Sequence, residues 1–331
     1  MVGADVDEAA KLLGPVPPGG QSPFAMDVGN RFEHQLRRDD AARLREAVGT
    51  ALDMESPDAF EVVDLDRQYP WTPDRERTAQ LRRQRTLELL QASAANALQR
   101  ATLVLHPRFR LEVFGAERDL EPDALILGAP PGAEPLVVEI KAFVDHQHRT
   151  DLHDLAQTRL QAAVYAVALR RTLAVAGLDV PRLDDALIVL RRPGSMFGSA
   201  GIEEIRREIE RVERVMATGP HFLVELLAEL PDGAVFDDLD TLRGLAVRYV
   251  PSFCQSRCGM SLQCRGAAHA ASDPAYFGSP VADVWRGVSS LRRAHRLVTG
   301  LDEPATEEEE AIVERLGPLR ARIDAARQRC S

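Results

Sequence analysis

The sequence predicts an α/β fold, in which helices flank a small mixed sheet, followed by a helical C-terminal region. Three observations support this prediction. Short segments rich in β-branched and aliphatic residues, separated by Gly and Pro turns, fill residues 108–143. Long segments with helical spacing precede and follow them, and one further apolar run lies at residues 184–192. Strands interspersed with helices in this way build a sheet that helices cover.

In the N-terminal part of the chain, the sequence predicts a flexible lead-in segment followed by two helices. Residues 1–21 end in the stretch GPVPPGGQ, whose Pro and Gly content is typical of a flexible segment. A first helix is expected to run from Asp27, as its N-cap, to residue 48. A second helix is expected to start at Thr72-Pro73 and to continue to residue 101, because Pro is favoured in the first helical turn.

From residue 108 onward, the sequence predicts the strands of the sheet and then the C-terminal helices. Three strands of the sheet are expected, at residues 108–116, 120–128 and 135–143. Helical spacing returns at 150–177, and a buried strand is expected at 184–192. After Gly201 the chain is mostly helical and ends in two amphipathic helices, at 281–299 and 305–329. The pattern divides the chain into three parts: a lead-in at 1–21, an α/β core at 22–200 and a helical region at 201–331.

Composition excludes some classes of protein. The formal net charge of −10 argues against a protein that coats nucleic acid over its whole surface, although a local basic groove is compatible with it. No apolar run approaches the roughly 18 residues of a membrane span. The N-terminus is acidic and lacks the apolar core of a signal peptide. A cytoplasmic protein without a membrane segment is therefore expected.

One lysine stands out among the basic residues. Of 41 Lys and Arg residues only Lys11 and Lys141 are lysine. Residues two apart on a strand face the same side, so Glu139 and Lys141 project together, and Asp123 belongs to the preceding expected strand. Two carboxylates from adjacent strands form a hard oxygen site that suits Mg²⁺ or Mn²⁺. A compact ammonium beside them can polarise an attacking water and offset charge that grows on a phosphate.

Four short motifs, in this order along the chain, resemble those of the PD-(D/E)xK nuclease superfamily in its RecB-type branch. This branch includes the iron–sulfur nucleases of CRISPR adaptation and the nuclease domain of AddB. The motifs are GNRFEHQL (29–36), EPDALIL (121–127), VVEIKAF (137–143) and LQAAVYAVAL (160–169). The resemblance extends over residues 22–265 in separate places, and the order and spacing of the motifs agree with the family.

The resemblance implies a restriction-endonuclease-like core and a role for each motif. It implies four catalytic residues: Glu33, Asp123, Glu139 and Lys141. It also implies that Mg²⁺ or Mn²⁺ is held by Asp123, Glu139 and the backbone of Ile140. Gln161 and Tyr165 lie one helical turn apart and are expected to hold a DNA phosphate or to support the lysine.

The same residues also have interpretations without chemistry. Glu139 and Lys141 can form a surface pair at the end of a strand. Glu33 can pair with Arg37 across one turn of a helix. The amide and the phenol of the fourth motif are also compatible with a plain boundary between helix and sheet.

Three of the four cysteines lie within eleven residues, as Cys254, Cys258 and Cys264 in the spacing C-x3-C-x5-C. Such a cluster indicates a soft-metal site. The last gap resembles that of the iron–sulfur nucleases, whereas the first gap is one residue longer and the cysteine that precedes the family's first motif is missing. A 4Fe–4S cluster with Cys330 as its fourth ligand is favoured, and a Zn²⁺ site completed by His269 is the alternative.

The resemblance implies a metal-dependent DNA nuclease that hydrolyses phosphodiester bonds in DNA repair, CRISPR adaptation or phage defence. Its expected partners are single- or double-stranded DNA and other proteins, such as a helicase or further defence or repair subunits. Arg82, Arg83 and Arg85 are expected to supply positive potential near the DNA. Two alternatives stay open: a non-catalytic DNA-binding or scaffold subunit with a nuclease fold, and a zinc-bearing adaptor protein.

Overall fold

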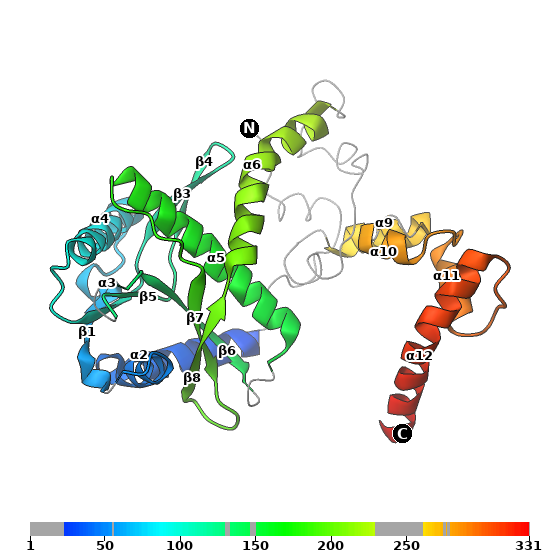
Figure 1. Ribbon diagram of the computed structural model, residues 1–331, viewed down its shortest axis with the longest axis horizontal. Coiled ribbons are helices and arrows are strands. Elements are labelled where there is room, and N and C mark those ends of the chain that lie inside the picture. The colour runs from blue at the N-terminus through cyan, green and yellow to red at the C-terminus, as the bar shows by residue number, and fades with distance from the viewer. Residues whose placement is uncertain are drawn as a thin grey trace. The chain divides into compact units, whose positions relative to one another are not determined.

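The computed structural model describes residues 23–54, 56–129, 133–145, 150–228, 261–273, 276 and 279–330. These residues belong to two compact units, the first of which runs from Pro23 to Glu225 (Figure 1). The first unit is a mixed α/β structure, as the sequence predicts. It extends beyond the expected boundary at residue 200, because a last strand and most of a helix complete it.

A six-stranded sheet forms the centre of the first unit. In spatial order its strands are β1 (Phe60–Asp64), β2 (Ala101–Leu105), β5 (Ala124–Leu127), β6 (Leu136–Val144), β7 (Asp185–Arg191) and β8 (Gly198–Glu204). The pairs β1–β2 and β6–β7 are parallel, whereas β2–β5, β5–β6 and β7–β8 are antiparallel. The inner strands β2 and β5 are buried along their whole length, as expected for a sheet that is covered on both faces.

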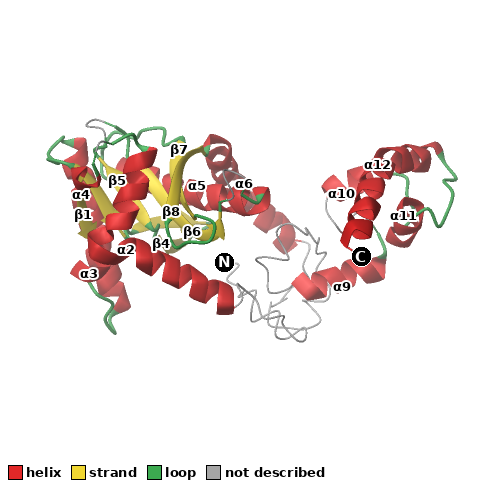
Figure 2. Ribbon diagram, turned by 90° about the horizontal axis from the view of Figure 1, so that it is seen from below, coloured by secondary structure: helices red, strands yellow, loops and turns green. Residues whose placement is uncertain are grey.

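Helices cover the two faces of this sheet (Figure 2). One face packs against α2 (Pro23–Ala51). The other face packs against three helices: α4 (Arg75–Ala94), α5 (Leu152–Val175) and α6 (Arg206–Ala228). The expected helix at 150–177 is confirmed as α5, and the helix expected from residue 72 is confirmed in its main part as α4, which ends before β2 begins.

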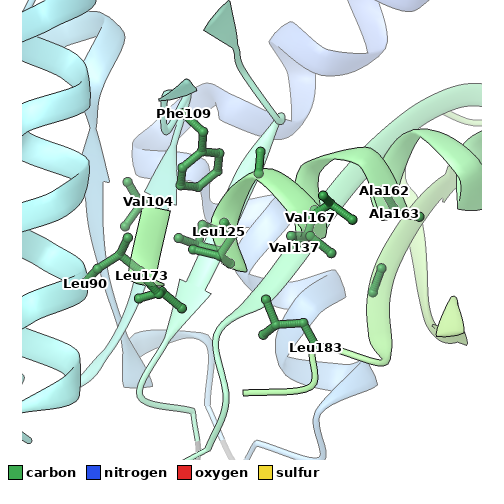
Figure 3. Packing of buried hydrophobic residues seen from close by; sticks show 14 of the residues in the cluster. Leu90, Val104, Phe109, Leu125, Val137, Ala162, Ala163, Val167, Leu173 and Leu183 are labelled. Atoms are coloured by element: carbon green, nitrogen blue, oxygen red, sulfur yellow. The ribbon is translucent and has the colours of Figure 1, made fainter. Parts of the chain in front are cut away.

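Alternation along the strands divides the apolar side chains between two cores. In β2, Leu103 belongs to the core beneath α2, and its neighbour Val104 belongs to the core beneath α5. Figure 3 shows the core beneath α5, to which three strands contribute Val104, Leu125 and Val137, and where Val137 lies beside Val167 of the helix. The packing on both faces fixes the register of the strands and so the positions of the polar residues that follow or interrupt them.

The strand expected at 108–116 does form, but the prediction that it joins the sheet is wrong. It is β3 (Phe109–Val113), which pairs only with β4 (Ala116–Leu120) in a separate hairpin. The cause is local, because Phe114 and Gly115 both adopt positive φ angles, of 52° and 77°, and turn the chain back at once. The sheet position is taken instead by β2, whose first residue the sequence assigned to the end of a helix.

Both edge strands of the sheet were absent from the sequence prediction. At one edge β1 follows the short 3-10 helix η1 (Pro57–Ala59) and leads into α3 (Leu65–Gln68), which Asp64 caps. At the other edge β8, with the sequence GSAGIEE, pairs with the buried strand β7 along its whole length. Neither edge strand has a continuous apolar run that would mark it in the sequence. β1 pairs with a strand that is distant in sequence, whereas β8 follows its partner β7 after a short connection.

A break divides α2 into two helical segments, whereas the sequence predicts a single helix. Arg38 has an extended ψ of 156°, and the next three residues, Asp39, Asp40 and Ala41, have left-handed backbones with φ angles of 53°, 57° and 55°. Asp tolerates this region better than most residues, because its short polar side chain can hydrogen-bond locally. The break sets the direction of the first segment, which carries the first sequence motif.

The described part of the second unit is helical. It contains α9 (Ser261–Ala271), α10 (Ser279–Val284), α11 (Leu291–Val298) and α12 (Glu307–Cys330). The helix expected at 281–299 is interrupted, because Gly287 has a positive φ of 87° and Ser290 then caps α11. Leu297 and Ile312 belong to a small apolar core that joins α11 to α12. No helix in the described ranges has both the length and the apolar content of a membrane span.

Candidate active site

The antiparallel pairing of β5 with β6 brings the second and third motifs together. Asp123 lies directly before β5, and the next residue, Ala124, is the register partner of Val138. Asp123 therefore stands beside the middle of β6, where its Oδ2 atom accepts a 2.7 Å hydrogen bond from the backbone N–H of Ile140. This bond fixes the carboxylate of Asp123 against the strand that carries Glu139.

Glu139 and Lys141 point to the same side of β6, as the sequence predicts. Only 1% of Glu139 is exposed, whereas 26% of the Lys141 side chain is exposed. The Nζ atom of Lys141 donates a 2.5 Å hydrogen bond to Oε1 of Glu139. The other oxygen of Glu139, Oε2, is buried and has no hydrogen-bond partner among the described residues. Because buried polar atoms almost always have a partner, this oxygen is a candidate atom for holding a ligand.

The electrostatic environment of Glu139 is unfavourable for a bare carboxylate. Burial and the nearby charge of Asp123 raise the pKa of Glu139 to about 8, and the opposing charge of Lys141 only partly offsets them. Glu33 adds a further, smaller repulsion. A carboxyl group with such a pKa gains a strong preference for ionisation once a cation lies beside it.

Glu33 reaches the same site from the first segment of α2. Burial and the charge of Asp123 raise the pKa of Glu33, whereas Arg37, Lys141 and His106 act to lower it. Its Oε2 atom also accepts a 3.1 Å hydrogen bond from Arg37, one helical turn away. Both interpretations of the sequence therefore hold at once, because Glu33 is paired within its helix and still contributes charge to the cluster.

Gln161 and Tyr165 on α5 form a pair beside the carboxylates. The Nε2 amide of Gln161 donates a 3.0 Å hydrogen bond to the hydroxyl oxygen of Tyr165. Burial and the charges of Glu139 and Asp123 raise the pKa of Tyr165. The phenol thus stays protonated, and its own O–H group can donate to an anion at the site.

Two residues that the sequence analysis did not select also belong to the site. His106 follows β2 and donates its backbone N–H to the carbonyl oxygen of Asp123 at 3.2 Å. Its Nδ1 atom lies 3.1 Å from Oε1 of Glu121. Burial acts to raise the pKa of Glu121, but the hydrogen bond with His106 and the charges of Arg108 and Arg82 outweigh it and lower the pKa.

The expectation that three arginines of α4 supply free positive potential is not met. Arg82 is fully buried and bonds Asp66 and the carbonyl oxygen of Tyr69. Arg83 and Arg85 are likewise ion-paired, with carboxylates on α4 and on the β3–β4 hairpin. Their charges are neutralised within the protein, so they do not form a basic groove.

The structure describes only part of the predicted thiolate site. Cys254 and Cys258 lie outside the described residues, as does the side chain of Cys330. Cys264 is buried in α9, whereas His269, five residues later on the same helix, is exposed. Five helical residues span well over a full turn, so the two side chains point in different directions. α9 therefore does not present both of them to one zinc ion.

The donors around Glu139 fit a hard divalent cation. Mg²⁺ typically uses only one or two protein carboxylates and keeps water or phosphate oxygens for its other positions. Asp123, Glu139 and the carbonyl oxygen of Ile140 meet this requirement. Within the described part of the chain, no three His, Cys, Asp or Glu side chains form a complete metal cage. No family model matches the sequence, and a search of curated proteins gave no significant match.

Proposed function

We propose that this protein is a Mg²⁺- or Mn²⁺-dependent deoxyribonuclease with a restriction-endonuclease-like core of the PD-(D/E)xK type, RecB-type branch. The observation that carries the proposal is the Oε2 atom of Glu139, a buried carboxylate oxygen without a hydrogen-bond partner in the described part of the chain. It lies in a cluster whose other carboxylates, Asp123 and Glu33, repel its charge. A divalent cation would relieve that repulsion and use the vacant lone pairs.

The residues of the cluster divide the chemistry among them. Asp123, Glu139 and the Ile140 carbonyl would hold the cation, which when bound supplies polarisation of the phosphate and of water. Lys141, partly exposed beside them, donates hydrogen bonds to the attacking water and offsets the charge that develops on the phosphate. Glu33, with its raised pKa, orients that water and accepts its proton.

The test is cleavage of labelled single- and double-stranded DNA. Cleavage should require Mg²⁺ or Mn²⁺ and stop in EDTA. Asp123→Ala and Lys141→Ala should each lower turnover by about 100-fold or more. Lys11→Ala, which removes the only other lysine of the chain, is the matched control and should cleave normally. Undiminished cleavage by Lys141→Ala would exclude the assigned site.

A second candidate is a non-catalytic DNA-binding or scaffold subunit. One observation favours it: Arg83 and Arg110 are engaged by carboxylates, so these two arginines offer little net attraction for DNA. Binding of DNA only together with a protein partner such as a helicase, and no cleavage in any metal, would support it. The acidic net charge of −10 is compatible with such dependence.

We also propose that Cys254, Cys258, Cys264 and Cys330 hold a 4Fe–4S cluster, with Zn²⁺ as the alternative metal. The support is the cysteine spacing, because thiolates select soft metals and would not hold the Mg²⁺ of the proposed active site. Anaerobically purified protein should show the broad visible absorption of a cluster and contain iron. A colourless protein that contains zinc would favour the alternative and the adaptor function that goes with it.

A further inference from the structure

Trp71 is a large aromatic residue on the segment that joins α3 to α4, and 40% of it is exposed. It is supported from within the protein by cations. The guanidinium carbon of Arg82 lies 4.5 Å, and that of Arg108 4.8 Å, from the centroid of the Trp71 ring. Such cation–π contacts hold the ring in place while its remaining surface faces solvent.

The support beneath Trp71 is rigid. The Nε and Nη2 atoms of Arg82, which is fully buried, donate hydrogen bonds of 3.0 and 2.8 Å to the carbonyl oxygen of Tyr69. Arg108 donates to Oε2 of Glu121, and Arg82 lies 3.7 Å from the same oxygen. The ring therefore needs little further ordering when it binds a ligand, which reduces the entropy lost on binding.

Trp71 is linked to the proposed active site by a series of contacts that runs through its supporting arginines. Glu121, which contacts both supporting arginines, is hydrogen-bonded to His106. The backbone N–H of His106 in turn bonds the carbonyl oxygen of Asp123. These contacts connect Trp71 with Asp123 within one compact unit.

The segment that contains Trp71, from α3 to the first turn of α4, carries exposed cations that form no ion pair with a described residue. Arg67, Arg75 and Arg77 are exposed, and none of them forms an ion pair with another described residue. The guanidinium carbon of Arg75 lies 5.7 Å from the Trp71 ring centroid. This differs from the neighbouring Arg83, whose charge is neutralised by two carboxylates. An exposed aromatic ring together with uncompensated arginines is the combination that binds single-stranded nucleic acid through its bases and phosphates.

We infer that Trp71 forms a subsite for an unpaired nucleobase, which stacks on the exposed part of the ring while Arg67, Arg75 and Arg77 contact the adjoining phosphates. This inference rests on the proposed function and gives its substrate class: a single strand or a frayed end. Bases within an intact duplex are already stacked on each other and do not present a free face to Trp71. The subsite therefore favours single-stranded over double-stranded DNA.

Tryptophan fluorescence tests the subsite directly. The chain has only two tryptophans, Trp71 and Trp285, so Trp285→Phe leaves Trp71 as the only indole reporter. Titrations in EDTA prevent metal-dependent cleavage and separate binding from catalysis. A short oligothymidine strand should quench the emission of Trp71 as it binds. An abasic strand of the same length, which keeps the phosphates but lacks the bases, should bind about tenfold more weakly and cause little quenching.

Substitutions of Trp71 provide the second test. The affinity of each variant for the same two strands is measured by fluorescence anisotropy of a labelled strand. Trp71→Ala should bind the oligothymidine strand about tenfold more weakly and the abasic strand as the unmodified protein does. Trp71→Phe retains an aromatic face and should restore most of the affinity. Trp285→Phe is the control, and circular dichroism checks that each variant is folded. An equal loss of affinity for both strands would assign Trp71 a structural role only.

The outcomes separate this inference from the proposed function. Base-dependent quenching without any DNA cleavage in Mg²⁺ or Mn²⁺ would support the subsite and refute the nuclease. Metal-dependent cleavage without quenching, with equal affinity for base-bearing and abasic strands, would support the nuclease and overturn the subsite. Failure of the unmodified protein to bind single-stranded DNA would also overturn the inference.

Discussion

Glu139 places a carboxylate at a buried position where its charge destabilises the folded protein. The group is buried on β6 between the charges of Asp123 and Glu33, and only Lys141 supplies an opposing charge. An apolar residue at this position would match Val137, which lies two residues earlier on the same face of β6 and is buried in the core. Proteins tolerate such local conflicts mainly where function requires them, so this conflict supports the proposed cation site.

The protonation of Glu139 gives a prediction about stability and pH. Burial and Asp123 raise the pKa of Glu139 from 4.5 to about 8 in the folded state. Between these two pH values the folded protein retains a proton that the unfolded chain has lost, so its free energy of unfolding falls as pH rises through this window. Glu139→Gln removes the titrating group. In metal-free protein it should raise the free energy of unfolding at pH 8 by on the order of 1–3 kcal/mol relative to the unmodified protein.

Urea unfolding from pH 5 to pH 9 in EDTA measures this effect. The difference between Glu139→Gln and the unmodified protein should grow with pH and level off above pH 8. Glu112→Gln, at an exposed position of β3, is the matched control and should show no such trend. A gap that stays constant with pH would show that Glu139 is ionised throughout.

At the scale of elements, the sequence predicts well those features that depend on local periodicity. Glu139 and Lys141 are two residues apart on one strand, so the sequence predicts that their side chains point to the same face. The buried strand at 184–192 is recognisable from its apolar run. The same spacing of two residues links Glu121 to Asp123, and this signal was present but not used. His106 had no comparable signal, because its place beside Asp123 depends on the pairing of β2 with β5.

Features that arise from pairing over long distances were not predictable in the same way. The edge strand β1 pairs with β2 across about forty residues, and β3 leaves the sheet because its own turn supplies a closer partner. The pairing of the Arg82 charge also depends on such contacts, since its partners Asp66 and Glu121 lie in other elements. A basic residue count therefore overestimates the free positive charge of this surface.

The break in α2 gives a prediction at the element scale. Asp40 is exposed and has a left-handed backbone, with φ 57° and ψ 44°, which costs an L-residue about 1 kcal/mol. Asp40→Gly should relieve this strain and raise the free energy of unfolding by about 1 kcal/mol. Glu46→Gly, at an exposed and regular position of the same helix, is the control and should lower it by about 1 kcal/mol. Urea unfolding of the two variants measures both shifts, and a loss of stability in Asp40→Gly would mean that α2 is continuous.

At the scale of the whole molecule, the proposed active site and the proposed thiolate site belong to different compact units. Every residue of the carboxylate cluster, as well as Gln161 and Tyr165, comes from the unit Pro23–Glu225. Cys264 lies beyond that unit, on α9. The ligand types also differ, since carboxylates prefer hard cations and thiolates soft ones. We therefore expect that metal can be removed from either proposed site without loss of the other site.

This separation leads to a prediction for cysteine variants. Cys258→Ser should lose iron or zinc, as measured by metal analysis, and its C-terminal region should become more sensitive to proteases, because bound metal stabilises the structure that its ligands belong to. Mg²⁺ should still raise the thermal midpoint of the first unit as it does in the unmodified protein, since a cation that binds only the folded state stabilises it in proportion to its affinity. Cys330→Ser is the paired variant: loss of metal there would confirm Cys330 as a ligand, and unchanged metal would remove it. If Cys258→Ser also abolished the Mg²⁺-dependent shift, the two sites would have to share a ligand or a common folding unit, and the separation argued from their positions and chemistry would be wrong.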